Sequence, residues 1–359
     1  MISPRIEIDL AAIEHNARSL VTRLAKRGIG VTGVTKATLG SPEIAKAMLR
    51  GGVTRIGDSR IENLEALRDG GIRVPLMLLR APAPDWADRA VASASITLLS
   101  DAAVVEALSV AAGRRALTHG VILMVELGDL REGVMVADVL DAARSISRTR
   151  HVTLAGLGTN LACRSGVIPG SDQMQELSAL ATAISAKFGV PAPLVTGGNS
   201  SNLGWALGRA PVGNVNDLRL GEAILLGIDP LTREPIEGLR TDAFCLVAPV
   251  IESLDKPSAP WGLRGQGAFG SAPAARERGT IIQTIVALGR QDVDAAGLTP
   301  PVGMRVLAAS SDHLVMETPG RLVAGAEVRF GLDYSALMRA MTSPFVVERL
   351  VTTPAPVPA

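Results

Sequence analysis

Eight short apolar segments, most of them followed by residues with helical periodicity, restrict the folds open to this chain. The segments expected to form strands are residues 29–36, 53–59, 74–79, 94–100, 120–127, 152–160, 193–200 and 218–227. Eight strands that alternate with helices are typical of a (β/α)8 barrel, whereas an open doubly wound sheet usually has fewer strands. The sequence therefore predicts an α/β fold in which residues 11–232 form a (β/α)8 barrel.

The pattern changes from about residue 235, where strand-like segments are separated by Gly, Pro and charged turns. We predict a β-rich C-terminal domain over residues 233–359, since a chain of 359 residues is also too long for one ordinary core. The opening segment RIEIDL (5–10) has the character of a strand but precedes a helix. We therefore expect residues 1–10 to pair with the C-terminal domain.

The overall composition argues against several classes of protein. A formal net charge of +1 gives no electrostatic reason to expect binding to nucleic acid or a membrane. No apolar run reaches the roughly 18 residues needed to span a bilayer, and the N-terminal segment does not resemble a signal peptide. Two cysteines, Cys163 and Cys245, fit a reducing cytoplasm, and the four histidines lack the spacing of metal ligands. We expect a cytoplasmic protein without a metal site.

Lys36 stands at the end of the first expected barrel strand, with no carboxylate close to it in the sequence. A charge at the end of an apolar strand destabilises the fold unless it has a partner or a function. The active sites of (β/α)8 barrels lie at the C-terminal ends of the strands, where Lys36 falls. The alternative is a structural lysine whose side chain extends past the strand end into water.

The segment GGNSS (197–201) follows the seventh expected strand. Phosphate groups in this fold are commonly bound by the loops after strands seven and eight, where glycines expose backbone N–H groups and a helix begins. A plain turn is the alternative for this segment alone. A phosphate site opposite a lysine that can form a Schiff base suggests pyridoxal 5'-phosphate as the cofactor.

Segments along almost the whole chain, in order, resemble one known family. They are GVTKATLGSPEIAKAML, RIGDSRIENLEALRDGGI, LMVELGDLREG, GLGTNLACRSGVIP, TGGNSSNL, DLRLGEAILLG, ALGRQDVD, ASSDHLVME and LDYSALMRAMTSPFV. The chain resembles the alanine racemase family, fold type III of the pyridoxal phosphate enzymes, and is most similar to its alanine/ornithine racemase branch. The resemblance implies a racemase of ornithine or another basic amino acid that works by proton transfer on both faces of Cα.

The resemblance also implies which residues hold the cofactor. Lys36 matches the lysine that binds it covalently, and Arg219 matches an arginine beside the pyridine nitrogen, where a permanent cation keeps that nitrogen unprotonated. Arg131 matches an arginine near the phenolic oxygen and the substrate carboxylate, with a surface ion pair to Glu132 as the alternative. The other implied cofactor contacts are Asn160, Gly198, Asn199, Ser200, Ser201, Gly221 and Glu222, the last two through backbone atoms.

The chain departs from common alanine racemases at three positions. Asn160 stands where they have a histidine near the cofactor ring, and Met124 stands where they have a lysine that supports the active-site arginine. Arg290 stands at the place of their second catalytic base, a tyrosine from the partner subunit. The second proton acceptor is therefore not where the common family keeps it.

Several residues are candidates for this second acceptor, because Lys36 serves only one face of the substrate. We favour Cys163, since an activated thiol near the barrel mouth can carry a proton, although cysteines are often simply buried. The segment SSDH (310–313) offers Ser311, His313 or an activated water. Tyr334 is the only tyrosine, but buried tyrosines are usually structural.

Residues of the C-terminal domain are expected to contact the substrate. Arg290 is one, and Asp292 and Asp312 are acids that match segments facing the site in related enzymes. Two acids beside an apolar pocket fit a diamino acid, because a buried ammonium group needs a paired charge. Against this, Leu263 and Gly267 stand in a stretch where the ornithine racemase branch has acidic residues.

Alternative functions remain open on the same fold. They are a broad-specificity or alanine/serine racemase, and a fold type III amino-acid decarboxylase that uses the SSDH segment. A cofactor-carrying protein without catalysis is disfavoured, because such relatives resemble the barrel alone. The resemblance further implies a head-to-tail homodimer in which the second domain of one subunit completes the site of the other.

Overall fold

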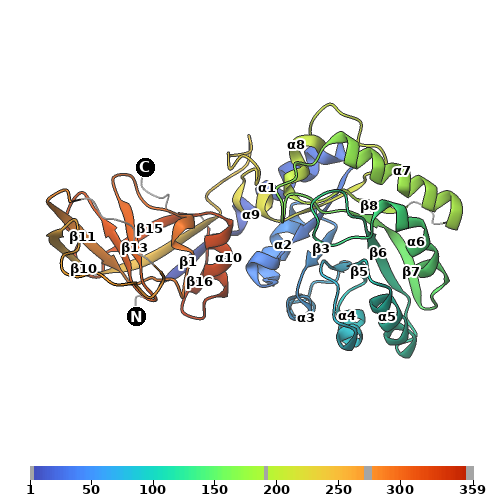
Figure 1. The fold of residues 1–359 in the computed structure, drawn as a ribbon, viewed down its shortest axis with the longest axis horizontal. Coiled ribbons are helices and arrows are strands. Elements are labelled where there is room, and N and C mark those ends of the chain that lie inside the picture. Colours follow the sequence, from blue (N-terminus) through green and yellow to red (C-terminus); the bar gives the residue numbers. More distant parts are fainter. Residues whose placement is uncertain (1–3, 190–192, 271–276, 353–359) are drawn as a thin grey trace. The chain divides into compact units, whose positions relative to one another are not determined.

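The computed structural model describes residues 4–189, 193–270 and 277–352, and Figure 1 shows its helices and strands. The chain forms two compact units. The barrel unit is Ala12–Thr241, and the sheet unit combines Met1–Ala11 with Asp242–Ala359. Residues 1–3 of the expected N-terminal segment lie outside the described residues.

Eight parallel strands close into a barrel in the order in which they occur along the chain, so the predicted (β/α)8 barrel is confirmed. The strands are β2 (Gly30–Val34), β3 (Arg55–Asp58), β4 (Leu76–Leu78), β5 (Ile96–Leu99), β6 (His119–Met124), β7 (Val152–Gly158), β8 (Leu194–Thr196) and β9 (Asp217–Leu220). The helices of this part of the chain are α1 (Leu10–Ala25), α2 (Pro42–Arg50), α3 (Ile61–Asp69), α4 (Ala87–Ser93), α5 (Ala102–Arg114), α6 (Val139–Arg148), α7 (Ser171–Phe188), α8 (Leu203–Ala206) and α9 (Glu222–Leu226). Four 3-10 turns accompany them: η1 (Lys36–Thr38), η2 (Pro84–Trp86), η3 (Val136–Asp138) and η4 (Ser200–Asn202).

The sequence explains why these elements form where they do. Ser41 caps α2 through its side chain and Pro42 occupies the first helical position, as expected for a helix start. Asp101 caps α5 by accepting a hydrogen bond from the Ala103 N–H at 2.7 Å. The barrel strands are largely apolar because helices cover one face and side chains fill the interior at the other. One buried cluster joins β4, β5 and β6 through Met77, Leu98, Ile122 and Met124.

All eight barrel strands end before the residue that the sequence predicts, and three of these ends bear on the candidate site. β2 ends at Val34, so Lys36 lies beyond the strand at the start of η1. β8 ends at Thr196, and the loop after it begins with two glycines. After β9, Gly221 breaks the strand and α9 begins at Glu222. In each case the residues past the strand end leave the sheet at the C-terminal mouth of the barrel and form a turn, a loop or the start of a helix.

The sheet unit contains the β-rich domain and the N-terminal strand. Its strands are β1 (Arg5–Asp9), β10 (Phe244–Pro257), β11 (Thr280–Val286), β12 (Leu298–Thr299), β13 (Arg305–Ala309), β14 (Leu314–Glu317), β15 (Glu327–Leu332) and β16 (Val347–Val351). The 3-10 turn η5 (Ala295–Gly297) and the helix α10 (Tyr334–Thr342) complete it. β1 pairs antiparallel with β10 and parallel with β16, and its buried Ile6 and Ile8 pack into the same core as Phe330.

Within the described residues, no helix is long and apolar enough to cross a membrane. The same part of the chain contains no group of three or more His, Cys, Asp or Glu side chains placed to bind a metal ion. Both cysteines are free thiols, Cys163 at the surface and Cys245 in the core.

Candidate active site

Five neighbouring strands of the barrel carry the expected cofactor residues just past their C-terminal ends. These strands follow one another around the barrel as β6, β7, β8, β9 and β2, because β9 pairs with β2 to close the sheet. The residues that follow them are, in the same order, Arg131, Asn160, Gly198 to Ser201, Gly221 with Glu222, and Lys36. Since parallel strands end together at one mouth of the barrel, the fold gathers these residues along one arc of that mouth.

Lys36 lies on a turn whose backbone is fixed by buried polar contacts. The preceding residue, Thr35, is fully buried, and its N–H donates to the Gly57 carbonyl at 3.1 Å. The Lys36 side chain is exposed, and its amine has no hydrogen-bond or ion-pair partner among the residues that the structure describes. An unpaired amine on a rigid turn is suited to covalent catalysis.

Asp58, the last residue of β3, supports this turn. Its buried carboxylate accepts hydrogen bonds from Thr35 Oγ1 at 2.8 Å, from the Arg60 N–H at 3.0 Å and from Asn63 Nδ2 at 3.0 Å. Burial raises the pKa of Asp58 above its ordinary value, and these hydrogen bonds oppose the rise. Both oxygens are thus used within the barrel, and Asp58 orients the turn that carries Lys36.

The loop after β8 has a backbone that requires glycine. Gly198 has a φ of +141°, and a Cβ there would lie 2.0 Å from Asn202 Oδ1. Asn199 caps η4, because its Oδ1 accepts hydrogen bonds from the N–H and the hydroxyl of Ser201, both at 2.8 Å. The loop therefore holds its two serines in fixed positions at a helix start.

The loop after β8 is bonded to the segment after β9. Ser200 Oγ accepts a hydrogen bond from the Ala223 N–H in α9 at 3.2 Å. Gly221 lies against the end of β2, and a Cβ there would be 3.2 Å from Val34 Cβ and 3.3 Å from the Val34 carbonyl. These two loops are the ones that commonly bind phosphate in this fold, and their hydroxyl and N–H groups have the chemistry for it.

Arg219 is a buried cation on β9. Its Nη1 donates to Thr196 Oγ1 at 2.6 Å and its Nη2 to the Thr159 carbonyl at 2.6 Å. Burial lowers its pKa to about 10, although the nearby Asp217 carboxylate opposes the shift. All of its hydrogen-bond acceptors among the described residues are neutral. A buried charge with only neutral partners is unfavourable for folding, which points to a ligand that uses it.

Asn160 connects Arg219 with the loop after β8. Its Oδ1 accepts hydrogen bonds from Asn199 Nδ2 at 3.1 Å and from Arg219 Nη2 at 3.4 Å. Its Nδ2 is buried and has no partner among the described residues. A buried donor without an acceptor costs about 1–3 kcal/mol, a cost that an acceptor on a ligand would remove. Asn199 Nδ2 also approaches Cys163 Sγ at 3.3 Å, so the same network reaches the exposed thiol.

Two charged residues of the arc are paired with neighbouring side chains. Arg131 forms a bidentate ion pair with Glu132, the contact expected as the alternative to a ligand contact. Burial would lower the pKa of Arg131, but the Glu132 carboxylate outweighs it and raises the pKa. Glu222 accepts a hydrogen bond from Arg233 Nη1 at 2.7 Å. A contact of Arg131 with a ligand stays a prediction, and the backbone of Glu222 is the part suited to a phosphate.

Two segments that the sequence links to the substrate lie together in the sheet unit. The Arg290 N–H donates to the Ser310 carbonyl, and the Gln291 N–H donates to the Ser311 carbonyl, both at 2.9 Å. A Cβ on Gly289 would lie 2.3 Å from the Asp312 nitrogen, so the two segments approach as closely as they do only because this residue is glycine.

Asp312 and Asp292 differ in their environments. Asp312 is exposed, and its Oδ1 bonds His313 Nδ1 at 2.8 Å, which lowers the pKa of Asp312. Asp292 is 6% exposed, and its two oxygens accept hydrogen bonds from the Gly289 N–H at 2.9 Å and from Ser343 Oγ at 3.0 Å. The Asp292 carboxylate therefore supports the turn, and Asp312 is the exposed acid of the two. A contact of Asp292 with the substrate stays a prediction.

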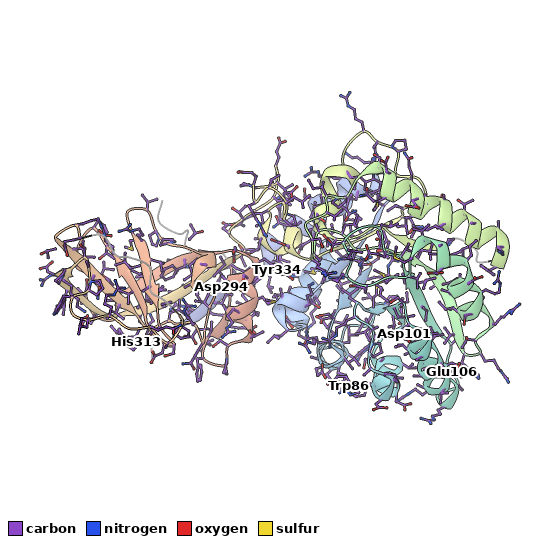
Figure 2. All side chains as sticks on the ribbon, in the orientation of Figure 1. Trp86, Asp101, Glu106, Asp294, His313 and Tyr334 are labelled. Carbon is purple, nitrogen blue, oxygen red and sulfur yellow. The ribbon has the colours of Figure 1, made fainter. Side chains whose placement is uncertain are left out.

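The remaining candidates also belong to the sheet unit. The Arg290 guanidinium stacks on Phe269, with its carbon 4.5 Å from the ring centre, and its Nε donates to the Ala309 carbonyl at 3.0 Å. Tyr334 is half-buried at the start of α10, and Figure 2 shows it in a different part of the sheet unit from His313. Ser311 is exposed, and its hydroxyl donates to Asp312 Oδ1 at 3.1 Å.

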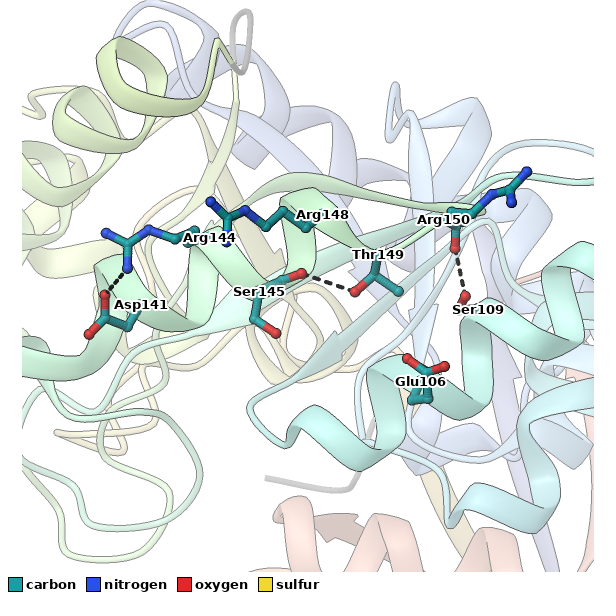
Figure 3. Close-up of a pocket in the computed structure, with 8 residues that line it drawn as sticks. All are labelled: Glu106, Ser109, Asp141, Arg144, Ser145, Arg148, Thr149 and Arg150. Carbon is teal, nitrogen blue, oxygen red and sulfur yellow. Dashed lines mark hydrogen bonds and ion pairs between the residues drawn. The ribbon is translucent and has the colours of Figure 1, made fainter.

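A cavity of about 580 Å³ lies on the outside of the barrel, between α5 and α6 (Figure 3). Its lining residues are Glu106, Ser109, Asp141, Arg144, Ser145, Arg148, Thr149 and Arg150. In Figure 3 the Arg144 and Arg148 side chains extend to one side and Arg150 extends to the other, and Arg144 is paired with Asp141 at 2.5 Å. None of the lining residues belongs to the loops at the C-terminal ends of the strands, so this cavity is separate from the candidate site.

Sequence motifs do not reveal the buried polar residues that support the site. Thr196 and Thr159 hold Arg219, and Asp58 holds the turn of Lys36. All three are polar residues at or next to the C-terminal end of an apolar strand, and this placement is the signal that identifies them. Asp129 is a buried polar residue in the loop after β6, away from any strand end, and has no such signal.

Proteins of known sequence resemble this chain over its full length. A family model described as alanine racemase, N-terminal domain, matches residues 8–229. The lysine racemase of Thermotoga maritima is 38% identical over 351 residues, which cover 96% of this chain and 98% of that protein. The ornithine racemase of Acetoanaerobium sticklandii is 34% identical over 354 residues, which cover 97% of this chain and 99% of that protein.

Solved structures share the architecture. The alanine racemase of Streptomyces coelicolor A3(2) superposes with a TM-score of 0.78 at 21% identity, covering 97% of this chain and 98% of that one. The alanine racemase of Bartonella henselae with covalently bound pyridoxal phosphate superposes with a TM-score of 0.74 at 16% identity, covering 98% of this chain and 100% of that one. The predicted combination of a barrel and a β domain is confirmed. The family match and the two full-length relatives show that this chain belongs to the alanine racemase family.

Proposed function

We propose that this chain is a pyridoxal 5'-phosphate-dependent racemase that interconverts the L- and D-forms of a basic amino acid such as lysine or ornithine. One observation carries the proposal: the unpaired Lys36 amine lies on the same arc of strand ends as the buried Arg219 cation and the serines after β8. The substrate class is supported by the two full-length relatives, which are named lysine racemase and ornithine racemase.

The residues of the arc fit the cofactor. Arg219 offers a buried cation for the pyridine nitrogen, and Asn160 offers a buried amide donor that lacks an acceptor. Ser200, Ser201 and the backbone at Gly221 offer donors for the phosphate, and Lys36 Nζ is the amine that would attach the cofactor covalently. When bound, the cofactor withdraws electrons from the substrate Cα and so makes its proton removable.

Racemisation needs one group that moves a proton on each face of Cα. Lys36 Nζ serves one face in this proposal, and the Cys163 thiol is the favoured group for the other. Asn199 Nδ2 lies 3.3 Å from Cys163 Sγ, so a hydrogen bond connects this thiol to the loop after β8. Ser311 and Tyr334 are the alternatives, both on the sheet unit.

The residues proposed to contact the substrate are those whose charges are opposite to the charges of its carboxylate and its distal ammonium group. Arg131 and Arg290 are the guanidinium groups proposed for the substrate carboxylate. Asp312 is the proposed partner of the distal ammonium group, since its carboxylate is exposed and held ionised by His313. Asp292 is the second acid proposed for this group and the less accessible of the two, because its carboxylate is buried and hydrogen-bonded within the sheet unit.

We propose further that two copies form a head-to-tail homodimer in the cytoplasm, so that one subunit's sheet unit completes the other's site. Two free cysteines fit a reducing compartment. Light scattering should give a mass near twice the 37.2 kDa of one chain, and a fully active monomer would contradict this proposal.

Incubation with single L-amino acids tests the proposed function. The purified, cofactor-loaded protein is given L-lysine, L-ornithine, L-alanine or L-serine, and the products are separated by chiral chromatography. We expect D-lysine or D-ornithine to form fastest, and Lys36→Ala to abolish the reaction. Faster formation of D-alanine or D-serine would favour the alternative specificity, and a diamine with release of carbon dioxide would indicate a decarboxylase. An unchanged substrate in every case, with the cofactor bound, would contradict the proposal.

A further inference from the structure

Asp129 is a fully buried carboxylate in the loop after β6. Its Oδ2 accepts a hydrogen bond from the Arg164 N–H at 2.8 Å, and its Oδ1 accepts one from the Ser165 N–H at 3.0 Å. The Ser165 hydroxyl donates to the Asp129 carbonyl at 2.9 Å. All of these donors belong to the loop after β7, so Asp129 joins two separate loops at the barrel mouth.

Other contacts strengthen the same junction. The Arg164 guanidinium donates to the Leu130 carbonyl. The backbone of Val167 and of Cys163 also bonds the Asp129 carboxylate. Burial would raise the pKa of Asp129, but these N–H groups outweigh burial and lower it. The side chain is therefore ionised near neutral pH and is surrounded by backbone donors, which are strong partners for an anion.

The backbone on both sides of the junction is strained. Leu130, next to Asp129, has a φ of +54°, and Ala162, next to Cys163, has a φ of +64°. Residues other than glycine keep such angles only where surrounding contacts hold them, and they occur often at functional sites. The loop after β6 is also held at its start. The buried Glu126 accepts hydrogen bonds from the Gly128 N–H at 2.5 Å and from the Arg131 N–H at 3.1 Å.

The junction lies between two residues of the candidate site. Arg131 follows Asp129 by two residues, and Cys163 begins the segment whose N–H groups surround the carboxylate. We propose that Asp129 is a positioning residue that fixes Arg131 and Cys163 relative to each other at the barrel mouth. Its effect on catalysis rests on the proposed function, whereas its effect on the loop can be measured without any racemase activity.

The reactivity of Cys163 reports on the loop directly. Cys163 is the exposed thiol and Cys245 is buried, so a disulfide reagent such as 5,5'-dithiobis(2-nitrobenzoic acid) should react first at Cys163 in the cofactor-loaded protein. Asp129→Asn keeps the size of the side chain but replaces one acceptor oxygen by a donor, which leaves the Arg164 or Ser165 N–H without an acceptor. We expect the rate constant for Cys163 to rise about tenfold or more.

Matched variants control this measurement. Cys163→Ser should remove the fast phase and so identify it. Asp141→Asn changes an exposed carboxylate on α6 and should leave the rate constant unchanged. Asp129→Glu retains a carboxylate and should bring the rate constant for Cys163 part of the way back to the wild-type value. If Asp129→Asn does not fold, Ser165→Ala decides: a rise of about twofold or more supports the junction, and an unchanged rate overturns it.

The catalytic consequence has a separate readout. With racemase activity established, Asp129→Asn should lower kcat/KM for L-lysine by about 10- to 100-fold per bound cofactor, because a released loop no longer holds both residues in place. A folded, cofactor-loaded Asp129→Asn protein with unchanged Cys163 reactivity and unchanged kcat/KM would overturn the proposal. A changed thiol reactivity in a chain that racemises no amino acid would instead refute the proposed function and leave the junction supported.

Discussion

Arg219 allows the requirements of folding to be separated from those of function. Burial lowers the pKa of its guanidinium well below the ordinary arginine value, to about 10. At 1.36 kcal/mol for each pH unit, keeping this charge inside the barrel costs the folded state about 3 kcal/mol. Arg219→Met removes the charge at similar length, and it leaves the Thr159 carbonyl without its donor at a cost of about 1–3 kcal/mol. The free energy of unfolding should therefore change by no more than about 2 kcal/mol.

Urea denaturation of the cofactor-free protein, followed by tryptophan fluorescence, measures this change. Leu220→Ala is the matched control, because Leu220 is the next residue of β9, is fully buried and has no charge. Leu220→Ala should lower the free energy of unfolding by about 2–5 kcal/mol, as is usual when a buried leucine is replaced by alanine. The racemase activity should respond in the opposite order, with Arg219→Met the far more damaging change. A loss of stability in Arg219→Met as large as that in Leu220→Ala would refute the argument that this arginine is retained at the expense of folding.

Three further predictions concern other parts of the molecule. Asp312→Asn should lower kcat/KM for L-lysine and L-ornithine far more than for L-alanine, and equal losses in a substrate panel would make this acid structural. Burial lowers the pKa of His119 to about 4, so the contribution of the neutral imidazole to stability is complete above about pH 6.5 and is lost as the pH falls toward 4. Between these pH values the free energy of unfolding of the wild type should fall by up to about 3 kcal/mol more than that of His119→Gln. Equal falls in pH-dependent denaturation would contradict this. Gly198→Ala places a Cβ 2.0 Å from Asn202 Oδ1 and should weaken cofactor binding at least about tenfold in a spectroscopic titration, whereas Gly204→Ala, with nothing within 4 Å, should not.

The fold could be predicted because the same pattern, an apolar segment that is usually followed by a helix, recurs along the chain. Eight apolar segments in one order are compatible with few architectures, and an error of two residues at the end of β2 or of four at the end of β8 does not change the barrel. Lys36 and Arg219 could be identified for a related reason, because each is a charge in or next to an apolar strand. The strand ends were less predictable, because the glycines and polar residues at the barrel mouth follow the apolar segments directly but are not part of the sheet.

The supporting residues depend on contacts that the sequence does not display. Asp129 bonds backbone groups at positions 164 and 165, and this partnership exists only because two loops fold against each other. Asp292 and Asp312 are the same residue type in neighbouring segments, yet one is buried beneath a turn and the other is exposed. Loop conformation decides both outcomes, and it is set by long-range packing rather than by periodicity or local propensity.

Solvent deuterium incorporation tests directly whether Lys36 and the arc around it move a proton on and off the substrate Cα. The cofactor-loaded protein is incubated with L-lysine and with L-ornithine in D2O, and the products are separated by chirality and weighed by mass spectrometry. We expect a D-enantiomer to appear with one deuterium at Cα, and Lys36→Ala to yield neither the D-enantiomer nor the label. A Lys36→Ala protein that still forms labelled D-amino acid, or a wild-type protein that binds the cofactor and labels neither substrate, would contradict this expectation.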